Sequence, residues 1–172
     1  MAETLTILKT RRSCRAYKPE LIEEEKLNAI IEAGTYAATG MGKQSPIIIA
    51  VTDPEVRNEL SRLNAAVMNA NMDPFYGAPE LLVVLANKDI GTYLYDGSLV
   101  MGNLMNAAAD LGVASCWIHR AKEEFETEEG KAILKKLGIE GNYEGIGNLI
   151  LGYAAGPEAA PAPRKADYVY RI

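Results

Sequence analysis

Three arginines and a serine lie within one short stretch near the start of the chain, Arg11-Arg12-Ser13-Cys14-Arg15. An arginine side chain offers a fork of hydrogen-bond donors that suits a phosphate or a carbonyl edge, and Ser13 adds a short-range hydroxyl. In an extended backbone, Arg11, Ser13 and Arg15 point to one side and Arg12 to the other. The cluster predicts a site for one compact anion. A solvated basic loop that faces nearby carboxylates is the alternative, because short basic runs are common.

Composition limits the partners of such a site. The chain has 172 residues, of which 48% are hydrophobic and 24% charged, which predicts one domain with a real core. Its net charge of −5 argues against a nucleic-acid partner, since nucleic-acid-binding domains are usually basic. The first ten residues contain no apolar stretch typical of a signal peptide. The apolar runs at 47–51 and 81–86 are far shorter than the roughly 20 residues that span a bilayer, so no membrane partner is expected.

The cysteines and the histidine predict neither a metal site nor a catalytic nucleophile. Cys14 and Cys116 are far apart in sequence and form no CxxC pair, and His119 is the single histidine. Reduced thiols in the cytoplasm are the simplest interpretation, although a disulfide stays possible. Cys116 is interpreted as a packed strand residue, because no basic group accompanies it in a recognisable pattern. No side chain is assigned as catalytic.

Helices and strands alternate along most of the chain. The spacing of apolar residues, together with capping and stop signals, predicts an α/β or α+β fold with helices packed on one sheet. Asp53-Pro54 is a typical helix start, and Gly112 and Gly138 are typical helix stops. Helices are expected at residues 4–9, 23–36, 53–68, 91–111 and 127–137, and strands at 47–52, 81–87, 113–118 and 146–154.

Two further segments point to a second subunit. The helix at 91–111 is apolar or small around much of its circumference, so it should be buried on more than one side. In so small a domain, the second covering surface can belong to another copy. Residues 156–172 form a proline- and alanine-rich arm that ends in Tyr168, Val169, Tyr170 and Ile172, an apolar tail expected to dock on a partner.

The pattern Arg11-Arg12-Ser13-x-Arg15-x-Tyr17 resembles the opening signature of the FMN-dependent nitroreductase family. Other motifs of that family follow in order along essentially the whole chain, and their joint order and spacing are more specific than any one of them. They lie at residues 37–44, 76–79, 96–98, 111–120, 152–153 and 163–165.

The resemblance implies an α+β fold with a mostly antiparallel central sheet flanked by helices, in an intertwined homodimer with FMN at the interface. Residues 1–172 would form a single flavin-binding domain, with 156–172 as its C-terminal arm. One subunit would bind the phosphate, the ribityl chain and the edge of the flavin ring, and its partner would contribute a loop of small residues. The implied FMN ligands are Arg11, Arg12, Ser13, Arg15, Ser115, Cys116, Arg164 and Lys165 from one subunit, with Ala38, Thr39, Gly40 and Gln44 from the other.

The implied roles differ along the flavin. Arg11 and Ser13 would serve the phosphate and ribityl end, and Arg15 the N1/C2 carbonyl edge, where a cation favours reduction. Arg164 and Lys165 would close on the phosphate. Backbone groups of Ser115 and Cys116 would lie near the N5/O4 edge.

The implied activity is ping-pong transfer of hydride from NAD(P)H through flavin to nitroaromatics, quinones or similar small electron acceptors. The chain departs from the family pattern at Ala38-Thr39, where Pro-Ser is usual, at Gly42, where Asn is usual, and after Gln44, where Pro-Trp is usual. These departures bear on the choice of acceptor. The alternatives are a flavin-dependent reductive dehalogenase-like or flavin-fragmenting enzyme, and a flavin-binding dimer without enzymatic turnover.

Overall fold

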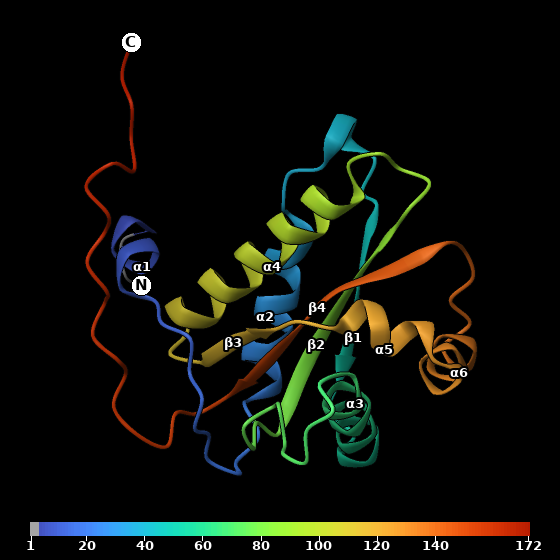
Figure 1. The fold of residues 1–172 in the computed structure, drawn as a ribbon. Coiled ribbons are helices and arrows are strands. Elements are labelled where there is room, and N and C mark those ends of the chain that lie inside the picture. Colours follow the sequence, from blue (N-terminus) through green and yellow to red (C-terminus); the bar gives the residue numbers. More distant parts are fainter. Residues whose placement is uncertain (1–3) are drawn as a thin grey trace.

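The protein is built around one antiparallel sheet. In the computed structural model, which describes residues 4–172, four strands lie in the order β1-β2-β4-β3 (Figure 1). Every neighbouring pair is antiparallel, which confirms the α+β class. The strands are β1 (Pro46–Val51), β2 (Glu80–Asn87), β3 (Ala114–Ile118) and β4 (Tyr143–Gly152).

The expected helices are all present, with one addition. The short helix α5 follows Arg120, whose φ of 81° places it in the left-handed region, and its six residues are too few to show an apolar period. The sequence prediction missed this helix. The helices are α1 (Thr4–Thr10), α2 (Glu24–Thr35), α3 (Pro54–Val67), α4 (Tyr93–Asp110), α5 (Ala121–Glu126) and α6 (Glu128–Lys136), with a 3₁₀ turn, η1, at Gly40–Gly42.

The helices cover both faces of the sheet, so two cores form. Helices α2 and α4 pack on one face, and α3, α5 and α6 pack on the other (Figure 1). Strand β2 serves both cores, because successive side chains of a strand point to opposite faces. Its Leu81, Val83 and Leu85 enter one core, while Leu82, Val84 and Ala86 enter the other. This double burial explains the continuous apolar run seen in the sequence.

Local chemistry fixes where two of the helices begin. The carboxylate of Asp53 accepts a hydrogen bond from the Glu55 amide at 2.8 Å, and Pro54 occupies the first helical position of α3. The hydroxyl of Thr127 accepts from the Gly130 amide at 3.0 Å and begins α6. Both starts agree with the sequence prediction.

Helix α4 is buried on one side and apolar on its other side as well. Val100, Met101, Leu104 and Ala108 belong to the core shared with α2. In contrast, Leu94, Tyr95 and Leu99 expose 48%, 74% and 50% of their surface. None of the described helices is long and apolar enough to cross a membrane.

The core on the α5 side contains a fully buried carboxyl group. Glu124 has no exposed surface and accepts hydrogen bonds from the side-chain amides of Asn64 and Asn148. Arg120 contacts this carboxyl group indirectly, because its Nε donates to the side-chain oxygen Oδ1 of Asn64 at 2.9 Å. Burial dominates over these hydrogen bonds and raises the pKa of Glu124 to about 7.

Because the pKa of Glu124 is higher in the folded state, the folded protein binds this proton more tightly than the unfolded chain does. The resulting stabilisation is complete below about pH 4.5 and is lost as the pH rises to about 7. The loss should amount to about 3 kcal/mol of unfolding free energy. Urea unfolding of the wild type and of Glu124→Gln across this range should give a stability difference that changes with pH. A substitution of the exposed neighbour, Glu126→Gln, should leave the pH dependence unchanged, and a pH-independent difference for Glu124→Gln would contradict the assignment.

Candidate functional site

The arginine-rich stretch is fixed to the sheet. Ser13 forms a parallel bridge with Ser115 of β3, and the Cys14 amide donates to the Ser115 carbonyl at 3.0 Å. Tyr17 forms an antiparallel bridge with Ala154, just beyond β4. The backbone of this stretch is thus paired with the sheet region at Ser13 and again at Tyr17.

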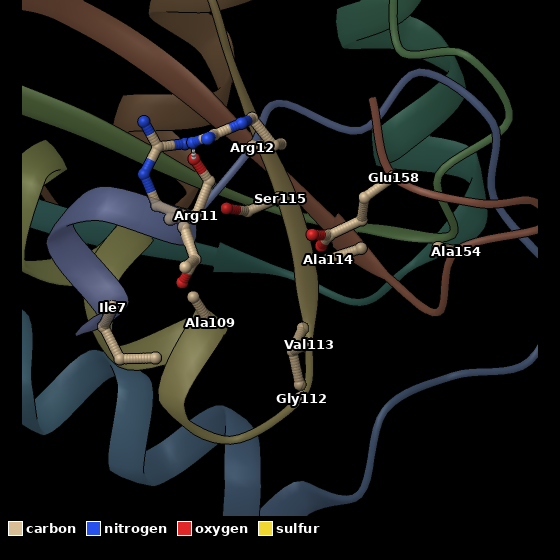
Figure 2. Close-up of a pocket in the computed structure, with 11 residues that line it drawn as sticks. Ile7, Arg11, Arg12, Ala109, Gly112, Val113, Ala114, Ser115, Ala154 and Glu158 are labelled. Atoms are coloured by element: carbon tan, nitrogen blue, oxygen red, sulfur yellow. Dashed lines mark hydrogen bonds between the residues drawn. The ribbon is translucent and has the colours of Figure 1, made fainter. Parts of the chain in front are cut away.

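The arginines border a cavity at the C-terminal end of α4. Arg11, Arg12 and Ser115 line a space of about 160 Å³, closed on one side by Ala109 and Gly112 (Figure 2). Glu158 of the C-terminal arm reaches the same cavity from the other side (Figure 2). The C-terminal end of a helix carries partial negative charge, so cations are stabilised there.

Two of the guanidinium donors in this cavity lack acceptors. Arg12 uses Nη1 to donate to the Lys9 carbonyl at 3.0 Å and to the Arg11 carbonyl at 2.6 Å. Arg11 Nη1 and Arg12 Nε, however, are buried without a hydrogen-bond partner among residues 4–172. Leaving charged donors buried and unpaired is costly, so the cavity is suited to a ligand with several acceptor oxygens. The donor set therefore fits the phosphate group that the resemblance implies.

Neighbouring cavities extend the site along the same stretch. Ser13 and Arg15 line a space of about 280 Å³ against residues 154–159. Arg164 joins Arg11, Arg12 and Ser13 around a further space of about 630 Å³. We call Arg11, Arg12, Ser13 and Arg15 the basic clamp. Lys165 is the other predicted cation of the C-terminal arm. Unlike Arg164, it points its Nζ atom at Tyr168, 5.6 Å from the ring centroid.

Ser115 and Cys116 point to opposite faces of β3, as successive strand residues must. Ser115 is 2% exposed and lines the cavity with the clamp arginines. Cys116 is 3% exposed and packs in the core that also contains Tyr17 and Ile118. Both cysteines are free thiols, and no cluster of His, Cys, Asp or Glu within the described part of the chain could hold a metal ion.

The predicted partner loop lies at the other end of α4. Gly40 is hydrogen-bonded to Asp96 in the first turn of α4, whereas Arg11 lies beside Ala109 near the last turn. At 1.5 Å per residue, Asp96 and Ala109 are about 20 Å apart. Figure 1 shows η1 and α1 at opposite ends of the helix. We call residues 38–44 the partner loop; its predicted site residues are Ala38, Thr39, Gly40 and Gln44.

The structure thus separates the predicted site residues of one chain into two groups. The clamp, Ser115 and Arg164 come together, and the partner loop does not join them. Thr39 and Gln44 line a different space of about 380 Å³, between α2 and β1.

Sequence reasoning assigned no role to two acidic residues near these groups. Glu158 lines two cavities of the clamp, but it lies in an arm without periodic signals. Asp96 belongs to a recognised motif, but its hydrogen-bond partners Gly40 and Ser45 are distant in sequence.

Comparison with known proteins places this geometry in context. The model of the nitroreductase family matches residues 8–80. A protein of Archaeoglobus fulgidus described as a putative NADH dehydrogenase/NAD(P)H nitroreductase is 31% identical over 158 residues, which cover 89% of this chain and 86% of that protein.

Solved structures agree over the full length. A nitroreductase with bound FMN from Bacteroides fragilis superposes with a TM-score of 0.90 at 31% identity, covering 100% of both chains. A second, from Desulfitobacterium hafniense and also with bound FMN, gives a TM-score of 0.88 at 28% identity over 100% of both chains. These similarities span the sheet, the clamp and the partner loop together, and the chain belongs to the nitroreductase family.

Proposed function

We propose that this chain is an FMN-dependent NAD(P)H oxidoreductase that acts as a homodimer. The observation that carries the proposal is the pair of buried, unpartnered guanidinium nitrogens of Arg11 and Arg12 beside Ser115. Solved relatives of the same family contain FMN, whose phosphate and carbonyl oxygens would satisfy such donors. Residues 1–172 would act as one flavin-binding domain, with 156–172 as its arm.

The clamp residues would divide the cofactor between them. Arg11, Arg12 and Ser13 would hold the phosphate and ribityl end, and Arg164 and Lys165 would add cations for a dianion that needs more than one. Arg15 would place its charge near the N1/C2 carbonyl edge, where a fixed cation favours hydride uptake by the ring. The Ser115 and Cys116 backbone would face the N5/O4 edge.

When bound, FMN supplies hydride chemistry that can link NAD(P)H oxidation to reduction of a nitroaromatic, a quinone or a similar electron-poor acceptor. The chain's own residues would hold the ring and supply positive charge, and the two substrates would use one cleft in turn, in a ping-pong scheme. No general acid is assigned to a side chain, since protons can come from water.

A second copy of the chain would complete the site. The clamp and the partner loop lie at opposite ends of α4, so a loop from another subunit would meet the clamp. The exposed apolar face of α4 supports such an interface, because large apolar patches on a monomer mark interaction sites. The arm would dock on the partner with Tyr168, Val169 and Tyr170, which are 68%, 70% and 82% exposed. The two free cysteines suit a reducing compartment such as the cytoplasm.

The first prediction from this proposal concerns the colour of bound flavin and its reduction. The purified protein, reconstituted with FMN if needed, should show the visible spectrum of oxidised flavin and should bleach on addition of NADH or NADPH without air. A nitroaromatic or quinone should restore the colour, and the faster nucleotide identifies the preferred donor. Bound flavin that neither nucleotide reduces would favour dehalogenase-like chemistry or a non-enzymatic dimer. A protein that takes up no FMN would contradict the proposal.

The second prediction tests the clamp. Arg12→Ala removes a charged donor from the cavity and should raise the dissociation constant for FMN on the order of tenfold to a hundredfold, as expected for loss of one charge-assisted hydrogen bond. Quenching of FMN fluorescence by the apoprotein measures this constant. Arg62→Ala is the matched control, because Arg62 pairs with Glu59 on α3, away from the cavity. Equal affinities for the two variants would argue against a cofactor role for Arg12.

The third prediction tests the interface. Leu99→Glu places a charge on the exposed apolar face of α4 and should shift the protein from dimer to monomer in sedimentation, with loss of FMN affinity. Leu137→Glu is the control, since Leu137 is similarly exposed, at 52% against 50%, but follows α6 on the far side of the sheet. A monomeric wild type that binds FMN fully would overturn the composite site.

A further inference from the structure

A buried carboxylate joins the partner loop to α4. Asp96, in the first turn of α4, is 2% exposed. One of its oxygens accepts from the Gly40 amide at 2.9 Å. The other accepts from the Ser45 hydroxyl at 2.7 Å and the Thr92 hydroxyl at 3.0 Å. Gly40 lies within the partner loop and Ser45 directly follows it, so Asp96 holds the loop to the helix at both of these points.

The charge of Asp96 makes these bonds strong. Burial alone would raise the pKa of this carboxyl, but the hydrogen bonds from Gly40, Ser45 and Thr92 outweigh it and hold the pKa below its usual range. The positive end of the α4 dipole also favours an anion in the first turn. Hydrogen bonds to an ionised acceptor are about twice as strong as neutral ones.

The partner loop needs such an anchor because its backbone is unfavourable. Met41 and Gln44 adopt positive φ values of 54° and 48°, which non-glycine residues rarely do. Such conformations persist only where surrounding contacts impose them. Within the loop, the Thr39 hydroxyl accepts from the Gln44 amide at 3.1 Å. Both positive-φ residues lie between the two points that Asp96 holds.

The loop also packs so closely against α4 that position 40 has no room for a side chain. A Cβ atom placed on Gly40 would lie 2.3 Å from the Thr92 hydroxyl oxygen and 2.9 Å from the Thr92 Cβ. Both distances are far below van der Waals contact, so any side chain at position 40 would push the loop away from the helix. Gly40 thus permits the hydrogen bond from its amide to Asp96.

We propose that Asp96 is a positioning residue for the cofactor site of the other subunit: it sets the conformation in which the partner loop meets FMN held by the neighbouring clamp. This inference rests on the proposed function. Asp96 itself would not touch the cofactor. Its effect would pass through Gly40 and Ser45 and would change FMN affinity at the site that contains the other subunit's clamp.

The direct test compares Asp96→Ala, Gly40→Ala and a matched glycine control. Asp96→Ala removes the acceptor, and Gly40→Ala forces the loop away from Thr92. Each should raise the FMN dissociation constant of the dimer on the order of tenfold. Asp96→Asn keeps an acceptor for the Gly40 amide and should restore much of the affinity. Gly91→Ala should bind FMN like the wild type, because a Cβ at Gly91 meets no atom within 4 Å.

Hydrogen exchange gives a readout that needs no cofactor. In the apoprotein, the Gly40 amide should exchange faster in Asp96→Ala than in the wild type, while amides of β2 stay protected. Unchanged exchange at Gly40 would overturn the role of Asp96 as an anchor. If Asp96→Ala fails to fold, Ser45→Ala and Thr92→Ala each remove a single donor, and the same measurements apply with smaller expected shifts.

Mixed dimers test whether Asp96 acts on the cofactor site of the other subunit or on the clamp of its own subunit. In a dimer of one Arg12→Ala subunit and one Asp96→Ala subunit, one site would combine both defects and the other would have an intact clamp and an intact loop. We expect one FMN per mixed dimer with wild-type affinity. If Asp96 supported its own subunit's clamp instead, no site of wild-type affinity would remain, and the proposal would fail.

The two levels of inference fail in different ways. A wild-type protein that binds no FMN, or forms no dimer, would refute the proposed function. A wild type that binds FMN as a dimer, alongside an Asp96→Ala variant of equal affinity, would refute only the positioning role.

Discussion

The length of helix α4 is the constraint on which the rest of the molecule depends. Its eighteen residues form a rod of about 27 Å that the core shared with α2 holds against the sheet. The basic clamp lies at one end of this rod and the partner loop at the other. Because a packed helix cannot shorten, the two groups of one chain lie about 20 Å apart. The same helix also exposes an apolar face, which is the surface that the proposed second copy would cover.

The two ends of α4 also differ in electrostatic character, and the chain places opposite charges accordingly. Asp96 lies in the first turn, where a carboxylate is stabilised, and Arg11 and Arg12 lie near the last turn, where cations are stabilised. The use of these charges differs as well. Asp96 accepts from three donors of its own chain and serves structure, whereas Arg11 Nη1 and Arg12 Nε are buried without acceptors among the described residues.

Local signals explain what could be predicted from the sequence. The start of α3 at Asp53-Pro54 and the doubly buried strand β2 depend on adjacent residues, and the clamp is contiguous, so all three were visible in the chain. Helix α5 was missed because its left-handed start at Arg120 carries no residue signal. The role of Asp96 was also missed. Its donors Gly40 and Ser45 lie 56 and 51 residues away, and only the folded chain brings them together.

The anchored loop bears on how this chain departs from its family's pattern. Gly42 stands where Asn is usual, and its φ of 66° is a conformation that glycine and asparagine tolerate better than other residues do. Thr39 stands where Ser is usual and keeps a hydroxyl, which accepts from the Gln44 amide. Both residues are therefore compatible with the loop backbone that Asp96 holds, while they change the side chains that the loop presents. Since this backbone also suits the usual residues and the amide of Asn is lost, the departures should affect the choice of electron acceptor more than the binding of FMN.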